Sequence, residues 1–461
     1  MQAKIIKISV IIGGIVLAWF LLFFVFGKEE VGPQAKLEFW NVFDTTETMK
    51  PILKNFTAKT GIRVNYRSFT DLQDYRETLL LELASGGGPD VLAVHNSWLP
   101  KYRNLLQPLP KTMGFSAKDV ARDFVDAVGK SVIFEEEIPK SDVKKGRVAE
   151  KQVFGLPMYL DTLALYFNKT FFRNILSKPY PAPELTWAGV REEVIKLSVQ
   201  DAESPDGFRL AGIALGRADN ITRGVDIFYA LYQQFGGQNL SEAGLEKVRD
   251  DSGKFYKPLS AALSFITAFS RDSRNKEYSW NAEIAAENPE KEISAFASGK
   301  VAMIAGYSYY FESIRDMLEQ QKRASGTMIE LSEVGIAAFP QVRDPQAGNP
   351  KTAIADFFTL SVAKSSENPF ESWQLILDLT SKNSQEKYFE ATKKPTSRRD
   401  LIETQKADPL RGIFAEQAVF ADILPIADDE LFSEAVADVL DGVSNGDLSL
   451  EEGMRRLENK F

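Results

Sequence analysis

The sequence predicts an α/β fold built around a parallel sheet with helices on both faces, preceded by one transmembrane helix. Short apolar runs alternate with helix-like segments in β-α-β-α-β order, which is the pattern of a parallel sheet. Hydrophobic residues make up 44% of the 461 residues, enough to build substantial cores. The third observation is an uncharged stretch of nineteen residues close to the N-terminus.

Residues 5–26 are predicted to cross the membrane. The uncharged part, Ile8–Phe26, is about 30 Å long as a helix, which matches one hydrocarbon core. It ends in the bulky run Phe23–Phe26, whereas a cleavable signal ends in small residues. We therefore expect an uncleaved signal anchor over 5–26 and a linker over 27–35, the alternative being cleavage. Lysines at the start of the stretch place the N-terminus in the cytoplasm and the rest of this single-pass cell-membrane protein on the extracytoplasmic face.

Composition excludes several kinds of chemistry. The chain has no cysteine and one histidine, His95, so disulfides, thiolate metal sites, a lipid-modified N-terminal cysteine and two-histidine zinc sites are ruled out. A net charge of −9 disfavours nucleic acid. No phosphate loop, nucleophile elbow or dinucleotide fingerprint occurs, and no spacing singles out a catalytic pair among the 64 carboxylates. We expect no cofactor, no metal, no nucleic acid and no enzymatic activity.

The first α/β unit is predicted as strand Leu37–Phe43, a helix over 49–56, strand Arg63–Arg67, a helix over 72–83 and strand Val91–Val94. Apolar residues recur at helical spacing in both helices, and the last strand is a continuous apolar run of the kind buried in parallel sheets. This unit alone predicts three parallel strands.

The same alternation recurs later in the chain. Further strands are expected at Leu163–Phe167, Ile213–Leu215, Val334–Phe339 and Phe357–Val362. Helices are expected after Thr186, after the Asn368-Pro369 pair and after the Ser449–Glu452 capping box. The charged stretch Glu135–Gln152 has few large apolar groups and is predicted to be an exposed loop.

Polar and aromatic residues stand directly after several apolar runs, where a parallel sheet lines its ligand crevice. They provide hydrogen-bond donors, acceptors and flat rings without a nucleophile and base, which suits a neutral polyhydroxylated solute. These residues are Asp44, His95, Asn96, Arg217, Asp219, Asn220, Tyr307 and Tyr309. Further candidates are Trp98, Asp161 and Trp280.

Each candidate has a structural alternative. Asp44 fits a helix cap, His95 a satisfied structural histidine, and Asp161, Asp219 and Asn220 fit ordinary turns. Tyr307, Tyr309 and Trp280 are equally consistent with packing. Trp40, Trp98 and Phe432 are more typical of wall or core residues.

Five blocks in order resemble the extracellular solute-binding proteins of the maltose-binding-protein type, the sugar-capturing subunits of ATP-binding-cassette (ABC) importers. The resemblance covers about residues 36–461 and is most specific in the third and fourth blocks. The blocks are LEFWNVFDT with FTAKTGIRVNYRS; LELASGGGPDVLAVHNSWLPKYRNLLQPLP; VFGLPMYLDTLALYFNKTFF with ELTWAGVREEVIKLS; AFASGKVAMIAGYSYYF; and FFTLSVAKSSENPFESWQLILDLTSKNSQEKYF with KKPTSRRDL.

The resemblance implies a two-lobed periplasmic-binding-protein fold, with two doubly wound α/β lobes joined by hinge strands and the ligand between the lobes. It places 36–159 and 304–354 in the N-terminal lobe and 160–303 and 355–461 in the C-terminal lobe. The crossings would fall near Tyr159–Thr162, Met303–Gly306 and Ala353–Asp356, and the ligand contacts on Asp44, His95, Asn96, Asp161 and Tyr307.

The expected function is therefore capture of a sugar or oligosaccharide by a monomer that delivers it to ABC transporter permease subunits. The late helix ELFSEAVADVL carries a single aromatic residue, Phe432, which argues against a long oligosaccharide. Other functions left open are a binder of a polyol or phosphate ester, a membrane-tethered sensor and a surface enzyme acting on polysaccharide.

Overall fold

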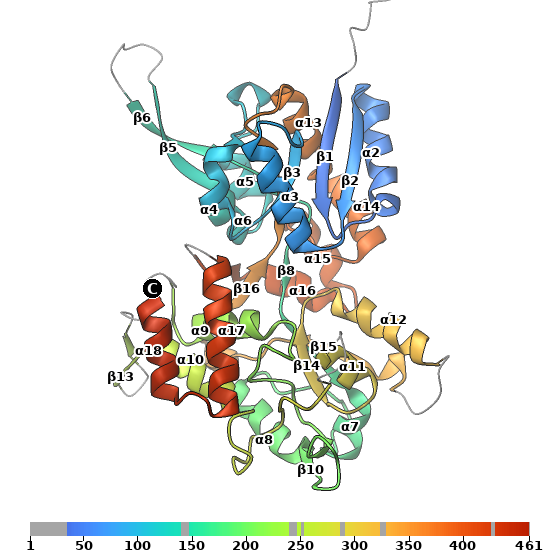
Figure 1. Ribbon diagram of the computed structural model, residues 1–461. Helices are drawn as coiled ribbons and strands as arrows, with labels where there is room; N and C mark the ends of the chain where they lie inside the picture. Colours follow the sequence, from blue (N-terminus) through green and yellow to red (C-terminus); the bar gives the residue numbers. More distant parts are fainter. Residues whose placement is uncertain are drawn as a thin grey trace, which may run out of the picture.

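A computed structural model describes residues 35–139, 147–238, 247–249, 253–285, 291–322, 329–425 and 429–460. These residues form two α/β lobes joined through a short strand region (Figure 1). The predicted anchor at 5–26 and nearly all of the predicted linker lie outside the described residues. Within the described ranges, no helix is long and apolar enough to cross a membrane.

The first lobe is built on a six-stranded sheet with the order β2-β1-β3-β17-β4, and β7 pairs with β17. β1 runs parallel to β2 and β3, as predicted, whereas β17 is antiparallel to β3. Its strands are β1 (Lys36–Val42), β2 (Arg63–Phe69), β3 (Val91–His95), β4 (Leu106–Gln107), β7 (Leu156–Pro157) and β17 (Phe358–Ala363). Its helices are α2 (Thr46–Thr60), α3 (Leu72–Ala84), α4 (Leu99–Tyr102), α5 (Ala117–Asp123), α6 (Asp126–Val132), α13 (Pro369–Leu379), α14 (Lys382–Thr392) and α15 (Arg399–Lys406).

Local sequence explains why α2 begins and ends where it does. The Thr45 side chain caps the first turn by accepting from the Thr48 N–H, and Gly61 ends the helix at a φ of 79°. The helix buries Met49, Ile52, Leu53 and Phe56, the predicted apolar stripe. Its packing fixes the loop between β1 and α2, where the chain faces the second lobe.

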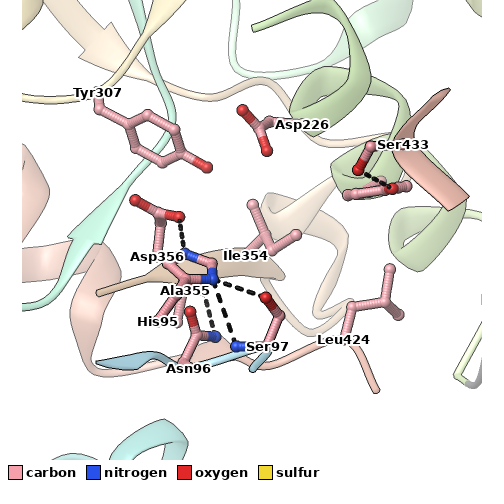
Figure 2. Close-up of a pocket in the computed structure, with 11 residues that line it drawn as sticks. His95, Asn96, Ser97, Asp226, Tyr307, Ile354, Ala355, Asp356, Leu424 and Ser433 are labelled. Atoms are coloured by element: carbon pink, nitrogen blue, oxygen red, sulfur yellow. Dashed lines mark hydrogen bonds and ion pairs between the residues drawn. The ribbon is translucent and has the colours of Figure 1, made fainter. Parts of the chain in front are cut away.

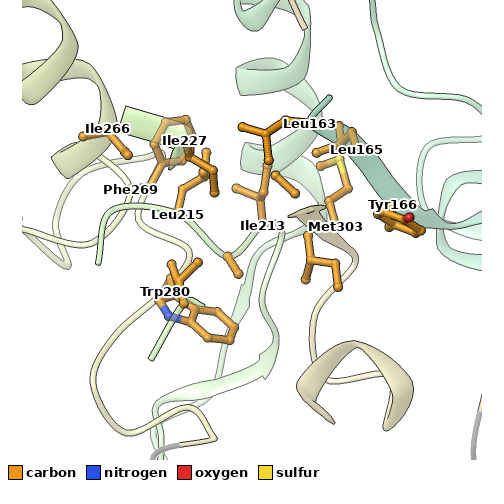
Figure 3. Packing of buried hydrophobic residues seen from close by; sticks show 14 of the residues in the cluster. Leu163, Leu165, Tyr166, Ile213, Leu215, Ile227, Ile266, Phe269, Trp280 and Met303 are labelled. Carbon is orange, nitrogen blue, oxygen red and sulfur yellow. The ribbon is translucent and has the colours of Figure 1, made fainter. Parts of the chain in front are cut away.

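The second lobe contains a three-stranded antiparallel sheet, β14-β9-β15, in place of the predicted doubly wound parallel arrangement. Its large core includes Trp280, Ile213 and Met303 (Figure 3). Its strands are β9 (Ala164–Asn168), β10 (Val199–Gln200), β11 (Phe208–Leu210), β12 (Val248–Arg249), β13 (Phe255–Tyr256), β14 (Met303–Gly306) and β15 (Val334–Ala338). Its helices are α7 (Lys169–Asn174), α8 (Trp187–Leu197), α9 (Gly224–Gln234), α10 (Pro258–Thr267), α11 (Lys291–Ala297), α12 (Tyr310–Lys322), α17 (Asp429–Asn445) and α18 (Leu450–Lys460).

A separate small sheet, β18-β16-β8, joins the lobes. β16 (Ala353–Asp356) runs antiparallel to β8 (Asp161–Thr162) and parallel to β18 (Ala421–Asp422). Gln417 of α16 (Gly412–Ala418) donates to the Thr162 hydroxyl and the Leu163 carbonyl, both at 2.9 Å. These bonds hold the crossing strand at the start of the second lobe.

The predicted division of the chain into lobes is wrong in its second half. The crossing expected at Met303–Gly306 is β14, which pairs along its whole length with β9 inside the second lobe. The chain returns to the first lobe only through β16, and β17 then joins the first sheet beside β3. Trp373 and Tyr388 accordingly lie in the first core rather than the second. Apolar strand runs are equally compatible with either sheet, so their pattern did not reveal which strands belong to which lobe.

The charged stretch predicted as a loop is an antiparallel hairpin of β5 (Ile133–Pro139) and β6 (Arg147–Val153) that projects from the first lobe (Figure 1). Most residues along β6 are exposed and only Val153 is buried, so the hairpin needs few large apolar side chains.

An ion pair links the two lobes. Arg76 of α3 lies 2.7 Å from Glu430 at the start of α17, and its guanidinium stacks over Trp98 with 5.3 Å to the ring centroid. Because α3 and α17 belong to different lobes, hinge opening would separate the two charges.

We predict that Glu430→Gln shifts the ligand-free protein towards more open conformations. Glu430 is exposed although Arg76 is largely covered, and a pair with a solvent-exposed partner contributes up to about 1 kcal/mol, a factor of about five in an equilibrium. Small-angle scattering should show a larger radius of gyration for this variant at low salt, and the difference should fade at high salt. Glu434→Gln, on the same helix, is the control. Equal scattering profiles for both variants would contradict the proposal that the Arg76–Glu430 pair holds the lobes together.

Candidate ligand-binding site

A cavity of about 310 Å³ lies between the lobes and takes its walls from both of them and from the connecting strands. Its lining residues are Phe43, Leu72, His95, Tyr159, Asp161, Arg223, Tyr309, Asp356, Phe358 and Lys394. A recess of about 90 Å³ adjoins it and shares His95 and Asp356 (Figure 2). The recess is also lined by Asn96, Ser97, Asp226, Tyr229, Tyr307, Ile354, Ala355, Leu424 and Ser433.

His95 and Asp356 form the centre of the site. His95 Nε2 lies 2.8 Å from Asp356 Oδ1, and its Nδ1 lies 2.7 Å from the Ser97 hydroxyl. Burial alone would raise the pKa of Asp356, but the His95 hydrogen bond and the nearby cations hold that pKa below its ordinary value. Asp356 is therefore an ionised acceptor at the junction of cavity and recess.

Arg223 is held in position from the second lobe. Its Nε donates to the Tyr309 hydroxyl at 2.7 Å, and its Nη1 donates to Asp226 at 3.3 Å. The guanidinium lies over the Tyr307 and Tyr309 rings, 5.1 and 5.6 Å from their centroids. Burial raises the pKa of Tyr309 to about 12. Burial also raises the pKa of Asp226, and the charge of Arg223 offsets only part of that rise. The arginine thus presents a fixed donor group to the cavity.

Lys394 reaches the cavity from the first lobe with the help of Asp44. Its ammonium lies 2.7 Å from Asp44 Oδ1 and 4.7 Å from the centre of the Tyr159 ring. Asp44 Oδ2 accepts from Asn41 at 3.1 Å and from Tyr388 at 2.8 Å. Asp44 is buried behind the cavity wall, so it positions the lysine and does not line the cavity.

Asp161 lines the cavity at the connecting strands, but its carboxylate is occupied. It accepts from the Ser308 N–H at 3.0 Å, from the Ser308 hydroxyl at 2.6 Å and from the Thr162 N–H at 2.9 Å. Burial raises its pKa to about 7 in spite of these bonds, and nearby Asp356 contributes in the same direction. Asp161 therefore ties the first crossing to the loop after β14.

The recess contains an uncommitted acceptor. Asn96 Nδ2 donates to the Ala355 carbonyl at 3.4 Å, while Asn96 Oδ1 is buried and has no hydrogen-bond partner among the described residues. Tyr307 and Asp226 face His95 and Asn96 across the space (Figure 2). A hydroxyl or a water molecule entering the recess would satisfy the amide oxygen.

Residues 43–386 match the model of the bacterial extracellular solute-binding protein family, which is most of the chain. The chain belongs to this family. Its members bind solutes outside the cytoplasm and are not enzymes, which confirms the predicted family and the predicted non-enzymatic role. A search of curated protein sequences finds no significant match.

Solved structures show the same two-lobed periplasmic-binding-protein fold. An ABC transporter solute-binding protein from Thermotoga lettingae bound to α-D-tagatose has a TM-score of 0.65 at 21% identity, over 93% of this chain and 99% of that one. The sugar-binding protein MalE from Xanthomonas citri has a TM-score of 0.68 at 18% identity, over 92% and 96%. A Listeria monocytogenes ABC substrate-binding protein in complex with cycloalternan has 0.65 at 14%, over 92% and 97%. Similarity at these identities establishes the fold of this solute-binding protein.

The structure places five of the predicted site residues on the cavity or recess of this solute-binding protein. They are His95, Asn96, Asp161, Tyr307 and Tyr309.

The other predicted site residues do not line either space. Trp98 packs in the first core, and Trp280 in the second. Asp219 pairs with Arg217 at 2.5 Å, and Asn220 accepts from the Trp280 indole N–H at 2.8 Å. These polar groups bond to one another or to backbone, so their position after an apolar run reflects packing. Trp40 and Phe432 are core residues, as favoured.

Several lining residues escaped the sequence interpretation. Phe43 and Phe358 lie at strand ends, and Asp356 lies in a segment recognised as a crossing, so position alone gave a usable signal. Arg223 and Lys394 gave none, because for each of them a partner that fixes its place at the cavity is far away in the sequence. Lys394 is separated from Asp44 by 350 positions, and Arg223 from Tyr309 by 86.

We predict that Asp161 makes this protein more stable at low pH. The folded-state pKa of about 7 lies above the ordinary value. The contribution of protonated Asp161 to the free energy of unfolding is therefore complete below about pH 4 and is lost as pH rises through about 7. One such group changes the unfolding free energy by at most about 1.4 kcal/mol per pH unit. Denaturant unfolding of wild type and Asp161→Asn across this range should show the wild-type advantage shrinking with pH. A difference independent of pH would contradict the prediction.

We also predict that Trp280→Phe destabilises the protein without changing ligand affinity. The substitution removes the indole N–H that donates to the buried Asn220 side-chain oxygen at 2.8 Å, at a cost of about 1–3 kcal/mol. Trp187→Phe is the matched control, because Trp187 lies in the same core and its buried indole nitrogen has no hydrogen-bond partner within the part of the chain that the structure describes. Equal losses in denaturant unfolding, or a loss of affinity in titration, would contradict this assignment.

Proposed function

We propose that this protein captures a neutral sugar of about mono- to disaccharide size between its lobes. It would present the closed complex to the permease of an ABC importer on the extracytoplasmic face, tethered by residues 5–26. The observation that carries the proposal is the cavity itself, which combines aromatic walls with ionised and polar groups from both lobes.

Charge balance supports a neutral ligand. Each cationic side chain at the site already faces a carboxylate: Lys394 faces Asp44 and Arg223 faces Asp226. His95 is likewise bonded to Asp356. A phosphate ester would have to compete with these carboxylates for the cations, whereas hydroxyls can bond to the paired groups without displacing them. This argument favours a sugar or polyol over a phosphate ester.

The size and walls of the cavity narrow the choice further. A volume of about 310 Å³ is at the lower end of the range of about 300–1,000 Å³ for small-molecule sites. Phe43, Phe358, Tyr159 and Tyr309 supply ring surfaces, and Asp356 supplies a charged acceptor. Rings cover the apolar C–H faces of a sugar while the charged groups bond its hydroxyls, so a small cyclic sugar uses both kinds of wall.

Ligand binding would drive closure because the walls come from both lobes. Contacts to Arg223 and Tyr309 on one side and to Lys394 and Phe358 on the other form together only when the lobes approach. A ligand that makes more contacts in the closed state shifts the population towards it.

The proposal is tested on the detergent-solubilised full-length protein with a thermal-shift panel of monosaccharides, disaccharides, polyols and sugar phosphates. A neutral sugar should raise the melting temperature, since ligand at 100 times its Kd adds about 2.7 kcal/mol. Titration calorimetry should then show that Asp356→Asn weakens its binding at least about 10-fold, the loss of a charge-assisted hydrogen bond.

Asp316→Asn, which changes an exposed carboxylate on α12, should leave affinity unchanged. Stabilisation by sugar phosphates alone, or wild-type affinity in Asp356→Asn, would overturn the proposed neutral-sugar site.

A further inference from the structure

Phe43 is the most conspicuous apolar side chain at the cleft. It lines the cavity and is 46% exposed, while Phe358 beside it is only 7% exposed. The two rings meet edge to face, with 6.1 Å between centroids and 77° between planes. Exposure of a large aromatic ring to solvent is unfavourable, so a ring held in this way is available for a partner surface.

The backbone of Phe43 is also strained. Its φ is 68°, in the left-handed region that bulky side chains rarely adopt. Four other non-glycine residues have positive φ: Ser177, Ala285, Lys291 and Lys393. None of these four lines the cavity or the recess. A strained residue at a binding site is a sign that its geometry serves the site.

The residues on either side of Phe43 explain why the strain persists. Its own N–H donates to the Phe69 carbonyl at 2.8 Å, which continues the pairing of β1 with β2. The next residue, Asp44, is fixed through its carboxylate by Asn41, Tyr388 and Lys394, and its carbonyl accepts from Ser68 at 2.7 Å. The chain must turn between two anchored residues, and the positive φ directs the Phe43 ring to the cavity rather than into the first core.

We propose that Phe43 is a specificity-determining residue whose ring covers the apolar C–H face of a pyranose in the cleft. The inference deepens the proposed function and rests on it. A pyranose has such a flat apolar face, whereas an acyclic polyol bearing comparable hydroxyls does not. Phe43 therefore selects ring sugars over polyols, a choice that hydrogen bonding by Asp356 and Arg223 alone does not make.

The test uses the full-length protein in detergent and titrates D-glucose, D-galactose, maltose and cellobiose, with sorbitol as the acyclic polyol. Phe43→Gly should weaken binding of the preferred pyranose at least about 10-fold, because the stacking surface is lost. Phe43→Tyr should keep near wild-type affinity, and Phe43→Leu should lose most of it despite similar apolar bulk. The affinity for sorbitol should differ between wild type and each Phe43 variant by less than about two- to threefold, because sorbitol has no flat face for the ring to cover.

A second readout addresses the strain without ligand. Phe43→Gly should melt at the same temperature as wild type or about 1–2 °C higher, because glycine adopts positive φ freely. Ser177→Gly, at an exposed positive-φ position away from the cleft, should give a similar shift with unchanged affinity. A merely packing role for Phe43 predicts the reverse: a lower melting temperature and unchanged affinity.

The outcomes separate this inference from the proposed function. Binding of a pyranose by wild type, with equal affinity in Phe43→Gly or in Phe43→Leu, would overturn the role of Phe43 and leave the sugar-binding proposal standing. Binding of sorbitol in preference to every pyranose would overturn the selectivity. Failure of all these sugars to bind wild-type protein would overturn both.

Discussion

The register of the strands around β16 is the constraint on which the site depends. In the connecting sheet, Asp356 pairs directly with Asp161, and two residues later Phe358 pairs with His95 in the first sheet. The chain therefore leaves the hinge and enters the first lobe within a single residue, Phe357. A slip of one residue in either pairing would turn Asp356 to the opposite face and remove its bond to His95. The buried carboxylate of Asp161, the partly buried carboxylate of Asp356 and the single histidine meet because these registers are fixed together.

Electrostatic pairing makes this cluster compatible with a folded protein. Buried charges are tolerated when each has a partner, and the cleft satisfies that condition through Lys394–Asp44, Arg223–Asp226 and His95–Asp356. Asp161 is different: among the described residues no cation pairs with it, and burial raises its pKa to about 7. Lys394–Asp44 and His95–Asp356 join different elements, whereas Arg223–Asp226 lies within the first turn of α9, and each pair orients a side chain towards the cavity before any ligand arrives. Preorganised polar groups reduce the ordering cost of binding.

Local pattern was sufficient to predict the first α/β unit of the first lobe. β1, α2, β2, α3 and β3 appear in the predicted order, because caps, apolar spacing and strand runs all act over short stretches. The assignment of later strands to a lobe failed because β14 and β17 have the same apolar character and differ only in their distant partners. For the site, strand-end position identified His95, Asn96 and Tyr307 but also selected Asn220, whose hydrogen bonds face inward. Sequence position identifies the edge of a sheet, and it does not distinguish a side chain facing the cleft from one facing the core.

Three departures from ordinary folding rules meet in the cleft: the positive φ and exposed ring of Phe43, the unpaired amide oxygen of Asn96, and the buried, cation-free carboxylate of Asp161. Each costs stability in the ligand-free protein. The first two are of a kind that a bound ligand can relieve, by covering the ring and by donating to the amide. Asp161 is different, because the Ser308 and Thr162 groups that satisfy it are part of the connection between the lobes. The cleft thus combines strain that binding can release with a carboxylate that holds the hinge. Closure around a ligand is favoured only if the free energy gained by covering Phe43 and satisfying Asn96 exceeds the cost of reorganising the hydrogen bonds of Asp161.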